Sequence, residues 1–462
     1  MPVMKDSLRR LSWGLLVIVC FGVSNSGYSE SFDCSMETAD QPINLPADVR
    51  IEGLARLWSE AAFGFPYFDQ VPDLDWDQAF RSAVPIVLET ESCWAYHREL
   101  QRFFALLKNN KTRVRYPIRA DISIPNIGLS ILGGKVFINA IGSSQIAEIP
   151  LGSEVVSIDG RDPIELASEE FADLVSVSRE DLRIRTAIQG DPDPSFGMLL
   201  GLIGTSVEIG FVRPDGSPGK ASFRRGGPEQ PSPEDVALWL DENENFYRPF
   251  VFKWLTDRIA YVYIGTFGQE KVVEVFETKL NELRQAEAIV LDIRGNVGGS
   301  TDNAVGILRH LTNRPAQGSL WRTRRVVALD QAIESTIDWE SGYHSELIPA
   351  PDPVVRPTIV LINTDTISAA EDFLVYADGI DHFRTVGRPT TGSTGSYKEI
   401  PLPSGALAMM VVKRDEYPDG RQFVGSGIQP DHYISPTVED LVTGRDPELE
   451  KALELLREAS PP

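Results

Sequence analysis

The stretch Ala288-Ile-Val-Leu-Asp-Ile-Arg-Gly-Asn-Val-Gly-Gly299 decides the fold of this 462-residue chain, because it joins a continuous apolar run to a glycine-rich loop. A strand that is apolar along its whole length is buried on both faces, which is typical of an α/β sheet covered by helices. A second apolar run, Pro357–Asn363, follows the helical pattern of residues 302–311. We therefore predict an α/β core with a mixed sheet and flanking helices over residues 251–462.

The rest of the chain divides into segments of different periodicity. Residues 27–118 show helical spacing of apolar residues and predict an N-terminal helical region. Residues 119–228 show short alternating strands, with Gly133-Gly134 as a tight hairpin turn, and predict a small β domain. Residues 229–250 are rich in proline and charge, as in an exposed linker. The fold class is therefore α/β, or α+β and multidomain.

The first residues predict the compartment. Lys5, Arg9 and Arg10 precede the apolar run Leu11–Val23, and small residues follow it, so residues 1–26 are predicted to be a cleaved signal peptide. An uncleaved anchor is the alternative. No later stretch approaches 18 apolar residues, so we expect an exported protein, periplasmic or extracellular, without an integral membrane domain once the signal is removed.

Charge and cysteine content narrow the partners. The chain has 44 Lys+Arg against 67 Asp+Glu and a formal net charge of −23, which repels phosphate backbones, so no nucleic-acid partner is expected. Cys34 and Cys93 remain after removal of the signal and are predicted to form a disulfide in an oxidising compartment, two unpaired buried thiols being the alternative. No metal-ligand spacing occurs, so no metal or other cofactor is expected.

The loops after the two apolar strands are the places where an α/β sheet holds its ligands. The glycines of Asp292–Gly299 allow close approach of the backbone and turn N–H groups outward, as the stabilisation of an oxyanion requires. Ser368 begins the helix that leads to Tyr376, where free N–H groups favour a developing negative charge. Taken singly, the first loop fits a plain strand-to-helix turn and Ser368 fits an N-cap.

Four motifs in this order resemble the tail-specific, or C-terminal processing, serine proteases, including the tricorn-core and retinoid-binding-protein-like branch. They are Asp292–Gly299 (DIRGNVGG), Thr366–Phe373 (TISAAEDF), Val386–Gly395 (VGRPTTGSTG) and Gly425–Asp431 (GSGIQPD). In addition, Gly152–Gly160 is similar to the core of that family's PDZ-like domain. The resemblance covers about residues 49–456 and assigns the PDZ-like domain to residues 119–228.

The resemblance implies roles for the residues of these motifs. Ser368 is the expected nucleophile, and the oxyanion hole is expected to use the N–H of Ala369 with that of Gly298 or Gly299. Glu371 and Asp292 are expected to be structural, holding the helix start and Arg294 respectively.

The general base is where the chain departs from the family. One branch has a lysine in a turn that reads Gly392-Ser393 here, and the other has a histidine where this chain has Lys111. The glutamate that supports the histidine is replaced by Val424. Three alternatives stay open: Lys111 is the base, His432 or Lys398 is recruited instead, or the chain binds peptides with little hydrolysis.

The function that follows is an exported serine-type peptidase, which cleaves peptide or protein substrates through an acyl-enzyme on Ser368. The PDZ-like domain is expected to admit the peptide by adding it to a strand edge. The alternative is a catalytically weak pseudopeptidase that acts as a peptide-binding or scaffold protein. No pattern in the sequence sets the oligomeric state.

Overall fold

The structure, a computed structural model, describes Cys34 and residues 43–115, 121–142, 148–190, 197–226, 236–238, 249–325 and 338–459. The predicted signal peptide and most of the predicted linker lie outside these ranges. Within them, no helix combines the length and the apolar character that crossing a bilayer requires.

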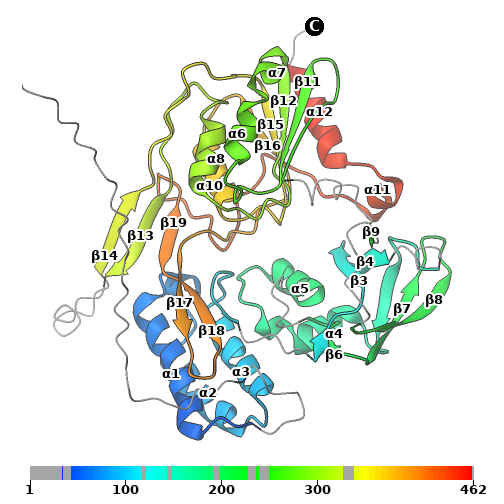
Figure 1. Ribbon diagram of the computed structural model, residues 1–462, viewed down its shortest axis with the longest axis vertical. Helices are drawn as coiled ribbons and strands as arrows, with labels where there is room; N and C mark the ends of the chain where they lie inside the picture. The colour runs from blue at the N-terminus through cyan, green and yellow to red at the C-terminus, as the bar shows by residue number, and fades with distance from the viewer. Residues whose placement is uncertain are drawn as a thin grey trace, which may run out of the picture. The chain divides into compact units, whose positions relative to one another are not determined.

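A six-stranded sheet forms the centre of the C-terminal half (Figure 1). Its strands, in spatial order, are β10 (Phe250–Trp254), β11 (Ile259–Ile264), β12 (Ala288–Asp292), β15 (Thr358–Ile362), β16 (Phe383–Gly387) and β20 (His432–Tyr433). The strands from β11 to β20 are parallel and β10 is antiparallel, so the sheet is mixed, as predicted. The carboxyl ends of β12 and β15 are neighbours, which brings the glycine loop and the loop of Ser368 together.

Helices cover both faces of this sheet. They are α6 (Val272–Glu277), α7 (Leu280–Gln285), α8 (Thr301–Leu308), α10 (Ala369–Ala377) and α12 (Pro447–Ala459), and α11 (Val438–Thr443) precedes α12 in the chain. Apolar residues of α6, α8 and α10 pack on one face of the strands, and Ala452 and Leu456 of α12 pack on the other. Burial on both faces explains the unbroken apolar runs in the sequence.

One helix expected from the sequence is interrupted. The periodicity of residues 271–285 predicts a single amphipathic helix, whereas the structure has α6 and α7 with a break at Thr278 and Lys279. The Thr278 hydroxyl donates to the Val275 carbonyl at 2.7 Å, and the N–H of Lys279 bonds to the carbonyl of Phe276, three residues back. These short-range bonds replace the regular helical pattern at the break.

The N-terminal helices are α1 (Ala47–Gly64), α2 (Trp76–Glu89) and α3 (Cys93–Ala105), with the short helix η2 (Phe68–Gln70) between the first two. Asp75 caps α2 by accepting from the N–H of Gln78 at 2.8 Å, as its place before the helix predicts. A disulfide joins Cys34 to Cys93, the first residue of α3.

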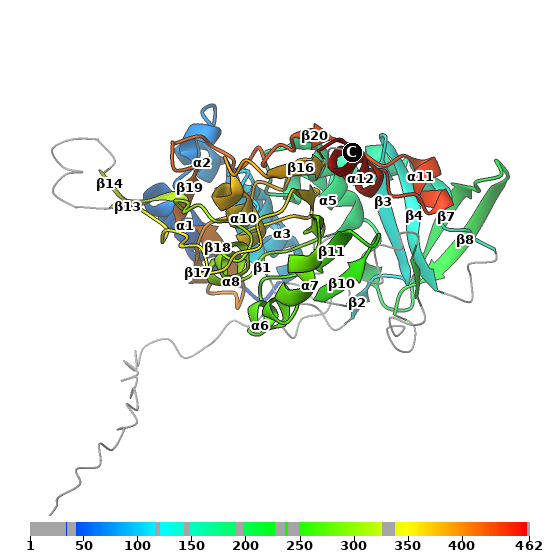
Figure 2. The same cartoon turned by 90° about the horizontal axis from the view of Figure 1, so that it is seen from above.

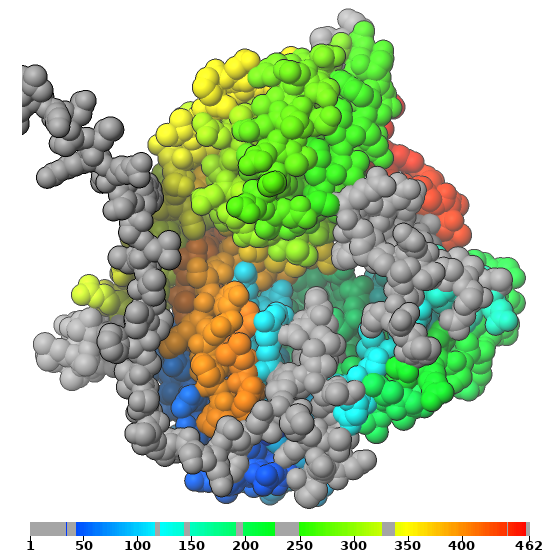
Figure 3. Space-filling view, viewed as in Figure 1, coloured from blue at the N-terminus to red at the C-terminus, as the bar shows by residue number. Residues whose placement is uncertain are grey.

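The N-terminal helices and the central sheet share one hydrophobic cluster. Strand β1 (Arg113–Arg115) pairs with β18 (Leu407–Val411), which pairs with β17 (Tyr397–Pro401). In the space-filling view the orange surface of β17 and β18 adjoins the blue surface of the N-terminal helices (Figure 3). Segments more than 290 residues apart therefore form one structural layer.

A third small sheet continues from β18. It contains β14 (Asp338–Tyr343), β13 (Leu320–Arg325) and β19 (Lys413–Glu416), all antiparallel neighbours. Since β19 follows β18 after one residue, both sheets are built on the same stretch of chain.

The β-rich segment has its own hydrophobic cluster. Its strands are β2 (Ile122–Ser123), β3 (Ile127–Leu132), β4 (Lys135–Gly142), β5 (Glu154–Ile158), β6 (Gly201–Leu202), β7 (Ser206–Val212) and β8 (Pro218–Arg224), with β9 (Val236–Leu238) paired to β4. Gly133 and Gly134, at φ values of 57° and 77°, form the hairpin turn predicted between β3 and β4. Figure 2 shows the β7–β8 hairpin of this sheet from above.

This segment also contains helices that the alternating strand pattern did not predict. They are α4 (Pro163–Glu170), η3 (Ala172–Leu174) and α5 (Glu180–Gln189). The start of α4 carries a recognisable signal, because Asp162 accepts from the N–H of Ile164 and of Glu165 and proline occupies the first helical position.

Candidate active site

Ser368 lies at a sharp turn between β15 and α10, with φ of 61° and ψ of −122°. This conformation costs a residue other than glycine about 1–3 kcal/mol and is typical of functional sites. The turn is held by the N–H of Ile367, which donates to the carbonyl of Asn296 at 2.9 Å, and by the hydroxyl of Thr366, which donates to the carbonyl of Ile293 at 3.1 Å. The serine side chain stays partly exposed at the start of the helix.

The glycine loop after β12 lies directly against Ser368. A Cβ added to Gly298 would lie 2.6 Å from the Cβ of Ser368, and the φ of Gly298 is 90°, so glycine is required there. The N–H of Gly298 donates to Oδ1 of Asn296 at 2.9 Å. Within the described ranges, no acceptor takes the N–H of Gly299 or of Ala369. Gly299 therefore has the more available N–H of the two glycines.

Lys111 lies in the turn between α3 and β1. Asn109 shapes this turn, since its Oδ1 accepts from the N–H of Lys111 at 3.0 Å and its carbonyl accepts from that of Thr112 at 2.8 Å. The hydroxyl of Thr112 accepts from the N–H of Val411 at 3.2 Å, which fixes the turn beside β18. The Nζ of Lys111 lies 3.2 Å from the Oγ of Ser368. In the part of the chain that the structure describes, Lys111 is the basic side chain that contacts this hydroxyl.

The surroundings of Lys111 act on its charge in two directions. Burial lowers the pKa of Lys111 below its ordinary value, because an ammonium loses hydration there. The carboxylates of Asp372, Glu371 and Asp415 favour the charged amine, whereas the nearby Lys413 disfavours it. Burial prevails, so the amine is more easily deprotonated than that of an exposed lysine.

Glu371 organises the backbone around Ser368. It is fully buried, and its Oε1 accepts from the Thr390 hydroxyl at 2.6 Å and from the N–H of Gly392 at 2.7 Å. Its Oε2 accepts from the N–H of Ser393 at 2.8 Å and of Ser368 at 3.1 Å. Burial raises the pKa of Glu371 against the effect of these hydrogen bonds. The turn that lacks the family's lysine thus holds the start of α10.

Asp292 has a different partner. Its carboxylate binds the buried guanidinium of Arg294 at 2.6 Å and accepts from the hydroxyl of Tyr261 at 2.8 Å. Arg294 also pairs with Asp446 at 2.8 Å and Glu448 at 2.7 Å, so this ion-pair network joins the glycine loop to the start of α12. The contacts are those expected of a structural aspartate that holds Arg294.

The other base candidates lie elsewhere. Lys398 is on β17 and forms an ion pair with Glu60 at 2.7 Å. His432 is on β20 and pairs with Val386 of β16. Among the described residues, neither side chain has a hydrogen bond to Ser368.

Sequence analysis did not single out three charged residues that act on Lys111, namely Asp372, Lys413 and Asp415, nor His344, which acts on Asp372. Asp372 belongs to the same motif as Ser368, and its Oδ2 accepts from the Thr301 hydroxyl at 2.6 Å. The other three residues follow no motif, so only the assembled fold reveals them.

The β-rich segment contacts the loops that carry the site. Arg179 donates to the carbonyl of Thr390 at 2.7 Å, and Thr390 in turn binds Glu371. Arg185 on α5 forms an ion pair with Asp365 at 2.7 Å, three residues before Ser368.

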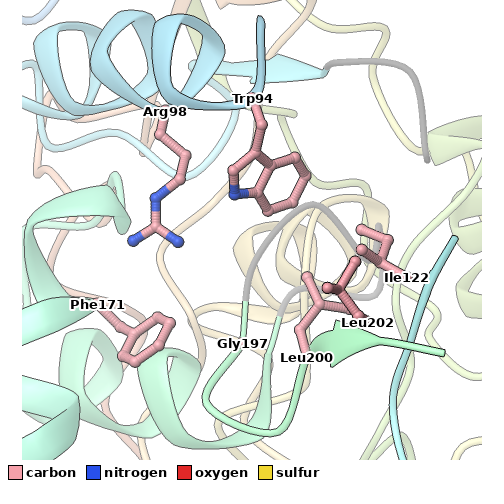
Figure 4. Close-up of a pocket in the computed structure, with 7 residues that line it drawn as sticks. All are labelled: Trp94, Arg98, Ile122, Phe171, Gly197, Leu200 and Leu202. Carbon is pink, nitrogen blue, oxygen red and sulfur yellow. The ribbon is translucent and has the colours of Figure 1, made fainter. Parts of the chain in front are cut away.

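A separate hollow of about 190 Å³ lies between α3 and the β-rich segment (Figure 4). Apolar side chains and one arginine line it: Trp94, Arg98, Ile122, Phe171, Leu200 and Leu202, with Gly197. None of these lining residues belongs to the loops around Ser368.

Comparison with known proteins finds similarity to one peptidase family in the segment that carries Ser368. Residues 258–434 match Peptidase family S41. The carboxy-terminal processing protease CtpB of Bacillus subtilis (strain 168) is 24% identical over 174 residues, covering 37% of this chain and 33% of CtpB. The match therefore spans about a third of the length of that relative.

Solved structures share the fold over most of the chain. Mature CPAF complexed with lactacystin is similar with a TM-score of 0.70 and 16% identity, covering 89% of this chain and 98% of that one. A putative peptidase from Parabacteroides merdae ATCC 43184 is similar with a TM-score of 0.51 and 17% identity, covering 89% and 97%. The predicted fold class is confirmed by this similarity.

Proposed function

We propose that this chain is a serine peptidase with Ser368 as nucleophile and Lys111 as general base. The match of residues 258–434 to peptidase family S41 and the similarity to a carboxy-terminal processing protease support this proposal. The observation that carries the proposal is the distance of 3.2 Å between Lys111 Nζ and Ser368 Oγ, since a general base must reach the proton that it takes. The lowered pKa of Lys111 supports the same role, because only the uncharged amine accepts a proton.

The reaction proceeds in two acyl-transfer steps. The uncharged amine of Lys111 takes the hydroxyl proton as Ser368 Oγ attacks the carbonyl carbon of the scissile peptide bond. The resulting ammonium gives this proton to the leaving amine nitrogen, and the acyl group stays on Ser368. Lys111 then takes a proton from water as the water oxygen attacks the ester carbon. It gives this proton to Ser368 Oγ when the ester bond breaks and the new carboxyl end leaves.

The N–H groups of Gly299 and Ala369 stabilise the tetrahedral oxyanion. Neither N–H has an acceptor among the described residues, so both are available to bind the oxyanion. Ala369 is also the first residue of α10, where the helix dipole favours negative charge. Gly298 contributes through its close contact with Ser368, because its own N–H already binds Asn296.

Substrate and location complete the proposal. The substrate is a peptide or protein, which the β-rich, PDZ-like segment admits by strand addition. The protein is exported, in keeping with the disulfide between Cys34 and Cys93, since such bonds persist in oxidising compartments.

The test is acylation of the purified chain by a fluorophosphonate, followed by intact mass. We expect labelling of the wild type, none in Ser368→Ala, and a rate at least about 100-fold lower in Lys111→Ala with folding intact. Lys398→Ala and His432→Ala are matched controls, because both remove base candidates that do not contact Ser368.

The outcomes separate the alternatives. Unchanged acylation in Lys111→Ala would contradict the base assignment, and a loss in either control would redirect it. Absence of labelling in a folded wild-type protein would favour the pseudopeptidase, a peptide-binding or scaffold protein with the same fold.

A further inference from the structure

Three ionisable side chains form a cluster: Lys413 and Asp415 on β19, and His344, which directly follows β14. The Nζ of Lys413 lies 3.0 Å from Oδ1 of Asp415 and 2.8 Å from Nε2 of His344. Nε2 of His344 is also 3.4 Å from the same carboxylate oxygen. Asp415 is 1% exposed, and the hydroxyl of Tyr67 accepts from its N–H at 3.2 Å. Lys413 is thus fixed by two partners in a mostly buried position.

The stretch of chain that leads to Lys413 is hydrogen-bonded to the turn that carries Lys111. Thr112, which follows Lys111, binds the N–H of Val411 through its hydroxyl. Lys413 is two residues beyond Val411, where β18 passes into β19. Arg414 is bound elsewhere, to Asp69 at 2.7 Å and Glu416 at 2.8 Å, so it does not take the place of Lys413.

Three buried carboxylates act on the amine of Lys111. Glu371 and Asp372 are supplied by α10 and Asp415 by β19, and each carboxylate favours the ammonium form of Lys111. Oδ2 of Asp415 is buried and receives no hydrogen bond from the described residues, so its charge is incompletely balanced. An ammonium group that takes no part in the reaction and is fixed beside Asp415 would balance the negative charge of this carboxylate.

We propose that Lys413, held by Asp415 and His344, is a positioning residue that adds to burial in favouring the uncharged amine of Lys111. Its fixed positive charge offsets the field of Asp415 and repels a second ammonium at Lys111. The Nζ of Lys413 and Nε2 of His344 lie at hydrogen-bond distance, which together with the ion pair to Asp415 fixes the position of the Lys413 side chain. This proposal rests on the proposed function, in which Lys111 is the base.

The experiment measures the ionisation of Lys111 without using activity. The full chain with Ser368→Ala is treated briefly with acetic anhydride over a range of pH, and acetylation of Lys111 is followed by peptide mass spectrometry. We expect Lys413→Met to raise the midpoint of Lys111 labelling by about one pH unit, because removing a like charge favours the ammonium form. Lys413→Arg, which keeps the charge, is the matched control and is expected to leave the midpoint near that of the Ser368→Ala parent.

A second pair of variants covers the case in which Lys413→Met fails to fold. Asp415→Asn is expected to lower the midpoint, and Lys413→Gln combined with Asp415→Asn is expected to lie above Asp415→Asn alone. Equal midpoints in the parent and Lys413→Met, or in this pair, would overturn the proposal.

Fluorophosphonate acylation of variants that keep Ser368 distinguishes the hypothesis that Lys111 is the base from the hypothesis that Lys413 acts on its ionisation. If Lys111 is the base, the pH–rate profile of fluorophosphonate labelling shifts in Lys413→Met in the same direction as the labelling midpoint. If Lys111→Ala leaves acylation intact, the base assignment fails, whereas the acetylation midpoints still decide the role of Lys413.

Discussion

At the start of α10 the chain places a serine in a backbone conformation that favours glycine, and beside it a lysine in partly buried surroundings. The positive φ is unfavourable for a serine, and the loss of hydration is unfavourable for a charged lysine amine. The N–H of Ser368 donates to Glu371, and the N–H of the preceding Ile367 donates to Asn296 of the glycine loop. The lysine is held by the Asx turn of Asn109. Local cost of this kind is typical of functional sites, where the surrounding structure imposes the geometry.

The backbone strain at Ser368 gives a prediction about stability. Ser368→Gly is expected to be more stable than Ser368→Ala by about 1 kcal/mol or more, because glycine adopts positive φ without a Cβ clash. Unfolding of both inactive variants in urea measures the difference. Ala370→Gly on the same helix is the control, where glycine is expected to destabilise. Equal stability of the two Ser368 variants would show that the turn relaxes.

Asp372 gives a prediction about pH. Burial and the negative charge of Asp415 raise its pKa in the folded state. A carboxyl whose folded pKa is raised is harder to ionise in the fold, so it lowers stability above that pKa, and this cost disappears as pH falls through the folded pKa toward about 3.8, the unfolded value. Asp372→Asn is therefore expected to gain stability relative to wild type at neutral pH and to lose this advantage near pH 4.

Urea unfolding of wild type and Asp372→Asn at several pH values tests this expectation. Asp302→Asn, an exposed aspartate on α8, serves as the surface control. A stability difference for Asp372→Asn that is constant with pH would contradict the raised pKa.

Among the elements, the connection from α3 through Lys111 into β1 carries the site. Helix α3 begins at the disulfide-bonded Cys93, and β1 pairs with β18 in the register Arg113 to Met409. The turn between them is therefore fixed at both ends. A small displacement of either element would move the lysine amine away from the serine hydroxyl.

The disulfide is expected to stabilise this connection. Cys34→Ser with Cys93→Ser opens a loop with a sequence separation of 59 residues, and loop entropy alone predicts a loss of about 4 kcal/mol. Denaturant unfolding of the oxidised wild type and the double variant measures it. Reduced wild type is expected to match the variant, and equal stability of the oxidised and reduced forms would contradict the prediction.

For the described chain from residue 43 onward, the main hydrophobic cluster extends from the N-terminal helices into the central sheet, whereas the β-rich segment has a cluster of its own. The segment of residues 251–462 supplies β17 and β18, whose pairing partner β1 lies outside it. The proposed nucleophile Ser368 therefore lies inside the segment of residues 251–462, and Lys111 lies outside it.

This arrangement predicts how fragments behave. Residues 251–462 expressed alone are expected to lack fixed tertiary packing, because the face covered by α1 and α3 becomes exposed. Near-ultraviolet circular dichroism and dye binding measure this loss. Removal of residues 121–226, with a flexible linker in their place, is expected to leave native packing, since that segment has a separate core. A fully folded 251–462 fragment would contradict the shared core.

The sequence by itself determined the features that depend on local chemistry. Apolar runs specified strands buried on both faces, Gly133-Gly134 specified a hairpin, and the motif order specified a serine at a helix start beside a glycine loop. These follow from side-chain periodicity and from the conformations that glycine permits, which are properties of short segments.

Only the tertiary structure decided which groups meet. Lys111 reaches Ser368 across a separation of 257 residues because β1 pairs with β18, and no local pattern specifies that pairing. The same holds for His344, which meets Lys413 across a separation of 69 residues. Burial and distance between charges set the ionisation of Lys111, and both exist only once the segments pack together.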